Sequence, residues 1–348
     1  MASEKLFEGI PPFPDNLPTA TIATISLAAL NEGDKGAAES LLAAAQELGF
    51  FLLDLNGDEM GKHLVEEIDD LFAVGKMTMD LPNDIKQMYL HDPPTSFLGF
   101  KPQGCSKIET MEPDRFEWFN LGQDRLTGSD PHQPLPGVVQ DNLPLFRSFL
   151  EHGQQIIGMI CRVLAEQLGL PPDSFTSLQT PSEPSGTVVR LIKAYAYPET
   201  EDLRTSMVHH TDIGTITLLA NVLGGLQILE PGKSPNDSTG SAWLWVRPQP
   251  GCLIVNLGDA MVQWTGGLLR SNVHRIRFPP GEQRFLDRYS LAILVRPERN
   301  APMKRLVQRG EECINDGDEN LLAWQWEVKK FEALAKGEDT VESKGGKP

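Results

Sequence analysis

The chain has 348 residues, of which 40% are hydrophobic and 23% charged, as is ordinary for a soluble globular protein. Its formal net charge of −17 disfavours nucleic acid and anionic lipid as partners. The four cysteines are far apart, the N-terminus lacks a signal-peptide pattern, and no apolar run is long enough to cross a bilayer. These features predict a cytoplasmic protein that binds neither nucleic acid nor membrane, and they leave its oligomeric state open.

The N-terminal half alternates helical patterns with short apolar runs. Its first helix pattern is rich in Ala, Leu and Glu and ends at Gly49, a residue type that commonly terminates helices. Residues 91–135 are loop-rich because glycines and prolines interrupt them repeatedly. The predicted elements are strands at residues 22–25, 50–53 and 116–119, and helices at residues 37–48, 59–79 and 143–168.

From residue 186 onward the pattern changes to short β-type runs separated by turns. Regularly spaced runs of this kind are typical of a barrel or a double-sheet jelly roll. We further expect an exposed hairpin loop at 231–241, a C-terminal helix at 321–334 and a disordered end at 340–348. The expected strands are residues 188–193, 215–219, 225–229, 243–246, 253–255, 272–278 and 289–295.

The triplet His210-Thr211-Asp212 is the first candidate site. In a strand, residues i and i+2 point to the same face, so His210 and Asp212 can both aim into one barrel interior, or they can sit at the strand end and the adjoining turn. His274 lies on a later predicted strand and can complete the set from across a barrel. Two histidines and one carboxylate form the facial triad of non-heme Fe(II) oxygenases, which leaves positions on the ion for substrate and oxygen.

Arg288 and Ser290 form a second candidate site one hairpin beyond His274. They are again at i and i+2 and share a face of their strand. A guanidinium offers a fixed fork to a carboxylate, and the serine hydroxyl adds a donor. The first hypothesis is therefore an Fe(II) oxygenase that binds an organic acid beside its metal.

Each motif alone has a structural explanation. An isolated His-x-Asp is common and usually structural, and Arg288 alone could be a surface charge. His209 competes with His210, but its i+2 neighbour is a threonine rather than a carboxylate. The remaining histidines lie in helical or loop regions and are better explained as solvated or packed. The hypothesis therefore depends on order, spacing and β context taken together.

The chain resembles the 2-oxoglutarate and Fe(II)-dependent dioxygenases of the isopenicillin N synthase-like family. The resemblance covers most of the chain. In the C-terminal half it runs through 210–219, 225–227, 250–251, 256–259, 271–275 and 288–290, and in the N-terminal half through 49–52, 99–100 and 115–118.

This resemblance implies a fold that is mainly β with flanking helices (α+β), built on a double-stranded β-helix, or jelly-roll, core. It implies Fe(II) held by His210, Asp212 and His274, and 2-oxoglutarate whose far carboxylate pairs with Arg288 and Ser290. O2 is the oxidant. Family members also use a tyrosine from an Asn-Tyr-Tyr-Pro-like strand. Here that strand reads Lys-Ala-Tyr-Ala-Tyr-Pro, without the Asn, and alignment on its proline makes Tyr197 the matching residue.

The implied organisation has four parts. They are an N-terminal dioxygenase-type α/β region (1–135), a helical connector (136–180), a jelly-roll catalytic core (181–300) and a C-terminal helix and tail (301–348).

The implied activity is oxidation of a C–H bond of a small organic molecule by hydroxylation, desaturation or ring closure, in secondary metabolism. Candidate substrate contacts are Phe100, Trp118, Tyr195, Trp264 and the loop 199–207, with Arg115 and Arg204 as readers of a polar group; core packing or solvation explains each equally well. Three alternatives stay open: an oxoglutarate-independent Fe(II) oxidase of the isopenicillin N synthase type, a non-catalytic jelly-roll binding protein, and a zinc hydrolase, which would not explain Arg288 and Ser290.

Overall fold

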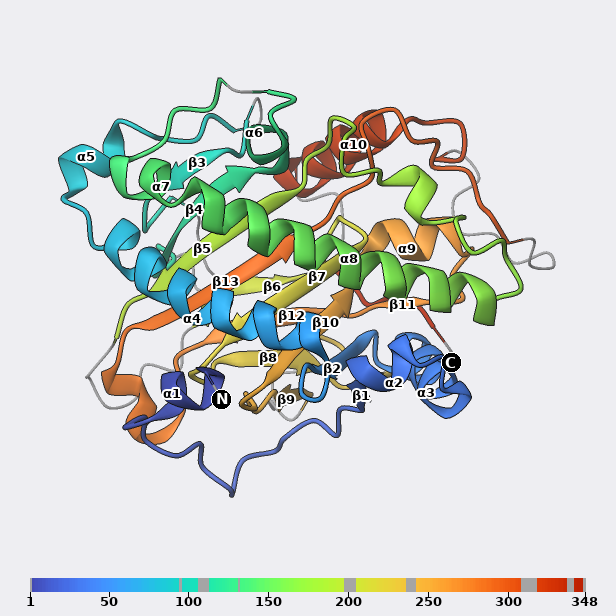
Figure 1. The fold of residues 1–348 in the computed structure, drawn as a ribbon, viewed down its shortest axis with the longest axis horizontal. Helices are drawn as coiled ribbons and strands as arrows, with labels where there is room; N and C mark the ends of the chain where they lie inside the picture. Colours follow the sequence, from blue (N-terminus) through green and yellow to red (C-terminus); the bar gives the residue numbers. More distant parts are fainter. Residues whose placement is uncertain are drawn as a thin grey trace.

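Two antiparallel-rich sheets form the core of the molecule (Figure 1). The computed structural model describes residues 2–93, 96–105, 113–130, 132–196, 205–235, 242–307, 318–336 and 341–346. The large sheet has the order β1 (Thr24–Ser26), β2 (Phe50–Asp54), β10 (Cys252–Leu257), β7 (Ile216–Asn221), β13 (Arg288–Leu294), β5 (Val188–Ala194), β4 (Phe116–Gly122), β3 (Gly99–Lys101). The small sheet has the order β6 (Thr205–His210), β12 (His274–Arg277), β8 (Leu226–Leu229), β9 (Trp243–Trp245). Within the described residues these sheets build the jelly roll that the sequence predicts.

Long helices cover the outer face of the large sheet (Figure 1). Helix α4 (Glu59–Met79) buries Leu64, Ile68 and Leu71, whose spacing of three and four residues forms a single apolar stripe. Its first turn is capped by Asp58, which accepts a hydrogen bond from the backbone of Gly61. This stripe packs against β5 and β13, so the strands beneath it present their other face to the barrel interior.

The remaining elements surround this core. Helix α8 (Leu143–Gln167) runs beside α4, and α3 (Lys35–Glu47) packs against both α8 and β2. The shorter elements are α1 (Ala2–Phe7), α2 (Leu27–Asn31), α5 (Asn83–Gln87), α6 (Gln123–Thr127), α7 (Gly137–Asp141), α9 (Asp259–Trp264), α10 (Ala323–Lys336), the 3-10 turns Thr176–Leu178 and Gly281–Phe285, β11 (Arg270–Ser271) and β14 (Lys344–Gly345).

Most predicted elements are confirmed with shifted ends, and residues 59–79 form a helix with the predicted bounds. The hairpin between β8 and β9 is confirmed by their antiparallel pairing, although residues 236–241 lie outside the described part. Strand β6 and helix α9 were not predicted as such. Strands from the predicted N-terminal region, such as β2 and β4, sit inside the large sheet beside core strands. The four-part division therefore stays a prediction.

The expected disorder at the C-terminal end is wrong for the described residues 341–346. Lys344 and Gly345 form β14, which pairs antiparallel with β11, and the Ser343 hydroxyl accepts a hydrogen bond from the backbone of Val273. Gly345 has φ +70, and a Cβ there would lie 2.2 Å from the carbonyl oxygen of Leu269. The ordered structure of residues 341–346 depends on contacts with residues distant in sequence, and the polar composition of this segment does not reveal such contacts.

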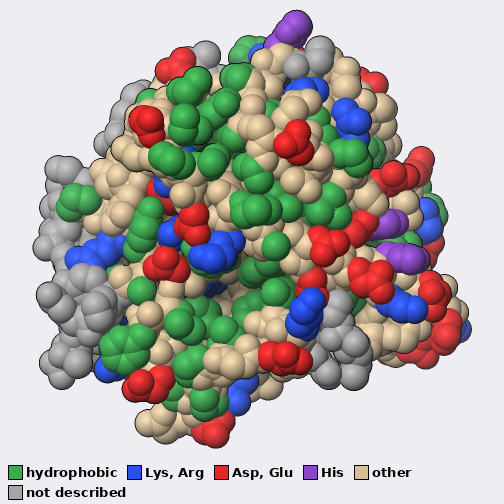
Figure 2. Space-filling view, turned by 60° about the vertical axis from the view of Figure 1, so that its left-hand side comes forward, with side chains coloured by type: hydrophobic (Ala, Val, Ile, Leu, Met, Phe, Trp, Pro, Cys, Tyr) green, Lys and Arg blue, Asp and Glu red, His purple; other side chains and the backbone are tan. Residues whose placement is uncertain are grey.

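Acidic, basic and hydrophobic side chains are interspersed on the face shown in Figure 2, around a central hollow. Among the helices in the described part of the chain, none combines the length and apolar character needed to span a bilayer.

A candidate metal centre between two cavities

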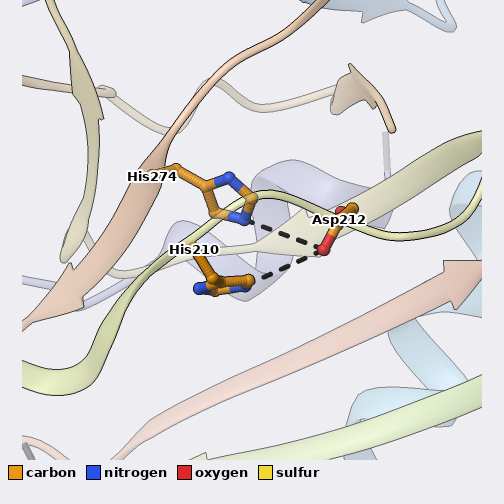
Figure 3. Close-up of side chains that lie close together, drawn as sticks. All are labelled: His210, Asp212 and His274. Atoms are coloured by element: carbon orange, nitrogen blue, oxygen red, sulfur yellow. Dashed lines mark ion pairs between the residues drawn. The ribbon is translucent and has the colours of Figure 1, made fainter. Parts of the chain in front are cut away.

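The structure brings His210, Asp212 and His274 together at one end of the small sheet (Figure 3). His210 is the last residue of β6, His274 is the first of β12, and the two are direct partners in the antiparallel pairing. Asp212 follows in the turn before β7, where a Cβ on Gly214 would lie 2.1 Å from the carbonyl oxygen of Val295. One potential ligand atom from each residue lies within 4.8 Å of the others.

Each histidine is oriented by a backbone carbonyl two residues earlier. His210 Nδ1 lies 2.9 Å from the oxygen of Val208, and His274 Nδ1 lies 3.2 Å from that of Asn272. These contacts suit an Nδ1–H donor, which leaves Nε2 as the lone-pair atom. The two Nε2 atoms lie 3.8 and 3.9 Å from Oδ1 of Asp212. The three atoms that converge are therefore those able to donate to a cation.

Asp212 is held through its other oxygen. Its Oδ2 accepts hydrogen bonds from Thr217 Oγ1 at 2.7 Å and from Asn256 Nδ2 at 2.8 Å. Both donors come from strands of the large sheet, β7 and β10, so the carboxylate connects the two sheets. Outer partners of this kind fix the orientation of ligating carboxylates.

The protonation states suit a cation site. Burial alone would raise the pKa of Asp212, but the two histidines and the hydrogen bonds from Asn256 and Thr217 lower it to about 2. Burial, with nearby His274, lowers the pKa of His210 to about 4. An ionised carboxylate therefore stands beside a neutral imidazole near pH 7, as metal binding requires.

Arg288 and Ser290 point into the same barrel interior from β13. Arg288 is 2% exposed; its Nε donates to the carbonyl of Gly224 at 2.9 Å and one terminal nitrogen donates to Ser290 Oγ at 2.6 Å. Its other terminal nitrogen, Nη2, is buried without a hydrogen-bond acceptor among the described residues. Burial lowers the pKa of this guanidinium to about 10, still well above neutrality. One donor nitrogen of this buried cation is therefore left without an acceptor among the described residues.

Two cavities meet at the triad. We name them the Arg288 cavity and the Trp118 cavity, each after a residue that lines that cavity and not the other. The Arg288 cavity has mainly apolar walls and contains Phe50, Ile192, Leu219, Leu226, Ile276, Arg288 and Ser290. The Trp118 cavity is more aromatic and more charged and contains Phe97, Asp114, Trp118, Val208, Arg296 and Phe331. Both are lined by Phe116, Arg190, Met207, His210, Asp212, Thr217 and Leu294.

The substrate candidates from the sequence are placed in different surroundings. Trp118 lines the cavity named after it. Phe100 is buried beneath the ammonium group of Lys86, and Trp264 is buried against Phe175; neither is among the residues that line the two cavities. Tyr195 lies outside them as well, where burial and nearby Glu117 raise its pKa to about 12.

Several expected residues lie beyond the part of the chain that can be described. Tyr197, Arg204 and most of the loop 199–207 belong to the range 197–204, which the structure does not describe. Arg115 is described; its guanidinium lies 5.6 Å from the ring centroid of Phe278, and it is not among the cavity residues.

Sequence reasoning missed Arg190, Asn256 and Thr217. Arg190 carried a signal, because it shares the inward face of its strand with Val188 and Ile192 while Val189 and Leu191 pack outward. A charged residue among inward-facing aliphatic ones requires an explanation.

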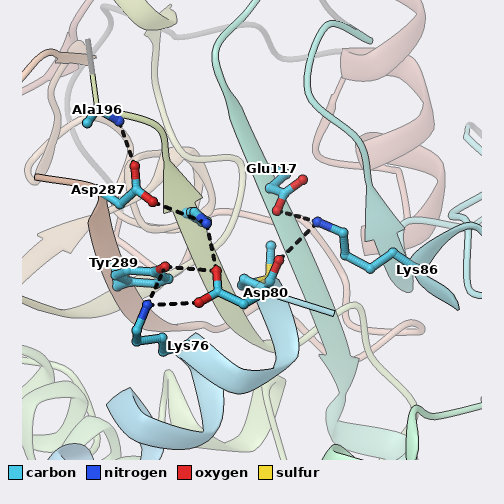
Figure 4. Close-up of polar contacts among 9 residues, drawn as sticks. Lys76, Asp80, Lys86, Glu117, Ala196, Asp287 and Tyr289 are labelled. Atoms are coloured by element: carbon cyan, nitrogen blue, oxygen red, sulfur yellow. Dashed lines mark hydrogen bonds and ion pairs between the residues drawn. The ribbon is translucent and has the colours of Figure 1, made fainter. Parts of the chain in front are cut away.

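An ionic cluster on the outer side of the barrel ties the end of β5 to the start of β13 (Figure 4). Asp80 accepts from Lys193 Nζ at 2.6 Å, from Lys76 Nζ at 2.8 Å and from the Tyr289 hydroxyl at 3.0 Å. Asp287 pairs with Lys193 at 3.2 Å. Because Tyr289 points out, its neighbours Arg288 and Ser290 point in. The cluster thus fixes the strand that carries them.

Comparison with known proteins agrees with this geometry. A family model described as the 2OG-Fe(II) oxygenase superfamily matches residues 187–297, and one described as the N-terminal region of non-haem dioxygenases in morphine synthesis matches residues 22–140. A 2-oxoglutarate-dependent dioxygenase of Aspergillus fumigatus is 30% identical over 314 residues, which is 85% of this chain and 80% of that protein. Another, from Glarea lozoyensis, is 30% identical over 316 residues, 89% of this chain and 87% of that protein.

Solved structures show the same fold. A full-length protein of Neurospora crassa, solved in complex with alpha-KG, has a TM-score of 0.73 at 21% identity and covers 92% of this chain and 100% of its own. JOX2, in complex with 2OG, Fe and JA, has a TM-score of 0.67 at 20% identity over 94% of this chain and 93% of its own. Together with the identity to the Aspergillus fumigatus enzyme, these matches identify the chain as a member of the 2-oxoglutarate and Fe(II)-dependent dioxygenase family, an oxidoreductase with a small-molecule substrate.

Proposed function

We propose that His210, Asp212 and His274 hold Fe(II), that Arg288 and Ser290 hold the far carboxylate of 2-oxoglutarate, and that the Trp118 cavity receives the molecule to be oxidised. The observation that carries this proposal is the convergence of three ligand atoms within 4.8 Å in a cavity where the buried Nη2 of Arg288 has no acceptor among the described residues.

The donor set suits Fe(II). Two imidazole nitrogens and one carboxylate oxygen on one side leave the other side of an ion open. A structural zinc site would have four protein ligands, and among the described residues only these three form a group of this kind.

The Arg288 cavity suits a compact dianion. Arg288 and Ser290 belong to the large sheet, whereas His210 and His274 belong to the small one. One molecule in the cavity can therefore reach the Arg288 Nη2 with one end and an ion at the histidines with the other. The aliphatic walls exclude water from the segment between them, which strengthens the charge pairing. We retain Tyr197 as a further contact to the co-substrate, because it follows the end of β5, the strand next to Arg288.

Bound Fe(II) and 2-oxoglutarate supply the oxidising chemistry, in which the keto acid is decarboxylated to succinate as O2 is consumed. The chain's part is to orient the ligands, exclude water and position a C–H bond. Asn256 and Thr217 keep the Asp212 carboxylate ionised and turned toward the histidines. The aromatic walls of the Trp118 cavity favour a small, largely apolar natural product, which undergoes hydroxylation, desaturation or ring closure.

The test is coupled turnover. Protein reconstituted with Fe(II), ascorbate and 2-oxoglutarate is incubated with a metabolite library, and succinate and oxidised products are followed by mass spectrometry. We expect at least one compound to raise succinate release in step with its own gain of oxygen or loss of hydrogen. Product formation without succinate would favour an oxoglutarate-independent oxidase, and tight library binding without oxidation would favour a binding protein.

A further inference from the structure

The charged side chains of the Trp118 cavity have partners, with one exception in the described part of the chain. Asp114 pairs with Lys101 at 2.7 Å, and Arg296 pairs with Glu327 at 3.0 Å. Arg190 has no carboxylate within ion-pair distance there, and its one hydrogen bond to a described residue runs from Nε to Oδ1 of Asn120 at 2.7 Å. Burial lowers its pKa to about 10, so it stays charged near neutrality.

Asn120 fixes the direction of the Arg190 guanidinium. The two residues are direct partners in the pairing of β4 with β5. Asn120 is fully buried, and its Nδ2 donates to the carbonyl of Phe97 at 2.7 Å, which orients its Oδ1 toward Arg190. With Nε bound in this way, the two terminal nitrogens form a fork that is available to a planar acceptor.

The Arg190 guanidinium lies over the ring of Trp118, and the Lys101 ammonium group lies 5.3 Å from the centroid of the same ring. Trp118 is two residues before Asn120 on the same face of β4, and its ring centroid lies 4.3 Å from the Arg190 guanidinium carbon. The ring is held from the same strand by Phe116 at 5.6 Å between centroids. Its indole Nε1 is buried without an acceptor among the described residues. A cation stacked on an aromatic ring, and a ring N–H without an acceptor among the described residues, thus line the same cavity as Asp212.

We propose that Arg190 binds a carboxylate of the substrate and that Trp118 packs against the adjoining ring or other planar part, so the substrate class is an aromatic or otherwise planar organic acid. This inference rests on the function proposed above. A local cation is required because the net charge of −17 repels anions at long range. Arg288 lines only the Arg288 cavity, whereas Arg190 also lines the Trp118 cavity, so a molecule in the Trp118 cavity can reach Arg190 but not Arg288.

The experiment uses the full chain loaded with Fe(II) and 2-oxoglutarate under anaerobic conditions. Calorimetric titration measures binding of 2-naphthoate, indole-3-carboxylate, trans-cinnamate and cyclohexanecarboxylate, each beside its primary amide. We expect acids to bind at least about tenfold more tightly than their amides, as a charge-assisted pair allows. We expect the planar acids to exceed cyclohexanecarboxylate. Arg190→Met should remove the preference for acids, and Arg190→Lys should restore part of it.

Affinity for 2-oxoglutarate is measured for every variant and also reports whether the variant is folded. Arg296→Gln is the matched control, since it removes a cavity charge that already has a partner, and it should keep the preference for acids. Equal binding of acids and amides, no binding by any acid, or an unchanged preference in Arg190→Met would overturn the inference. Weaker 2-oxoglutarate binding in Arg190→Met with unchanged acid binding would assign Arg190 to the co-substrate instead. Failure of the wild type to bind 2-oxoglutarate would reject the proposed function itself and is seen before any acid is added.

Discussion

The two cavities differ in what fixes their chemistry. In the Arg288 cavity, backbone and serine contacts hold a guanidinium, and the walls are mainly apolar, which suits the compact dianion proposed for it. In the Trp118 cavity, an arginine is held by one asparagine among aromatic rings, and the charged residues Asp114 and Arg296 already pair with residues outside the cavity lining. On the proposed function, the Arg288 cavity would hold the co-substrate and the Trp118 cavity the substrate. Both cavities depend on the same three ligands.

The largest effect should come from the shared ligands. Asp212→Ala removes the anionic ligand between the two histidines, and we expect coupled turnover to fall by more than about 100-fold. Iron content after anaerobic loading and desalting provides the second readout. An Asp212→Ala variant that retained iron and turnover would contradict the assignment of Asp212 as a ligand at the junction of the two cavities.

Arg288→Met should affect one cavity only. The co-substrate loses its charge-assisted partner, so the Kd for 2-oxoglutarate should rise by about 10- to 100-fold. Ser290→Ala, which leaves the guanidinium in place, should give a smaller rise of a few-fold. Isothermal titration with Fe(II)-loaded protein measures both. A Kd unchanged in Arg288→Met would place the co-substrate elsewhere.

Asn256→Ala tests the support beneath the ligands. It removes one of the two donors to Asp212 Oδ2 without touching the three converging atoms. We expect Fe(II) affinity to fall by about tenfold, the lower end for outer-sphere partners, because Thr217 still holds the carboxylate. Competition with a chelating dye measures it. The Fe(II) affinity of the double variant Thr217→Val with Asn256→Ala should fall further than that of either single variant.

The smallest effect should come from the ionic cluster around Asp80, which lies outside both cavities (Figure 4). Burial alone would raise the pKa of Asp80, but hydrogen bonds from Lys193, Lys76 and Tyr289 lower it to about 2. A carboxyl group whose pKa is lowered by folding stabilises the fold at pH values above its unfolded-state pKa, which is near 4. This contribution is lost as the pH falls toward 2.

Asp80→Asn should therefore lower the Tm by about 1–3 °C at pH 6, a modest change because solvent screens this partly exposed group. The gap from wild type should narrow as pH falls from about 4 to about 2. The Kd for 2-oxoglutarate should stay the same. A gap that widened in acid would contradict the assigned direction of the pKa shift.

The sequence predicts His210 with Asp212, and Arg288 with Ser290, because each pair depends on a separation of two residues within a strand or at its end. Alternation along β13 places Arg288 and Ser290 on one face, whereas Asp212 follows the end of β6 by two residues and approaches His210 from the turn before β7. Helix 59–79 is likewise encoded by its own apolar spacing and cap. These features require no knowledge of which strands become neighbours.

What the sequence does not reveal depends on strand pairing. Arg190 becomes informative only when β4 places Asn120 and Trp118 beside it. Asn256 and Thr217 become supports only when β10 and β7 bring them to Asp212. Trp264 and Phe100 illustrate the converse, since aromatic character alone does not distinguish a core position from a cavity wall. Tertiary partners, rather than local propensity, determine these roles.

Anaerobic titration of the Fe(II)-loaded protein with 2-oxoglutarate tests the central claim most directly. A ferrous ion chelated by the keto acid absorbs weakly in the visible region. We predict a saturable band in the wild type, the same band at higher 2-oxoglutarate concentrations in Arg288→Met, and no band in Asp212→Ala. A wild type without the band, or an Arg288→Met variant that saturates at the wild-type concentration, would contradict the account.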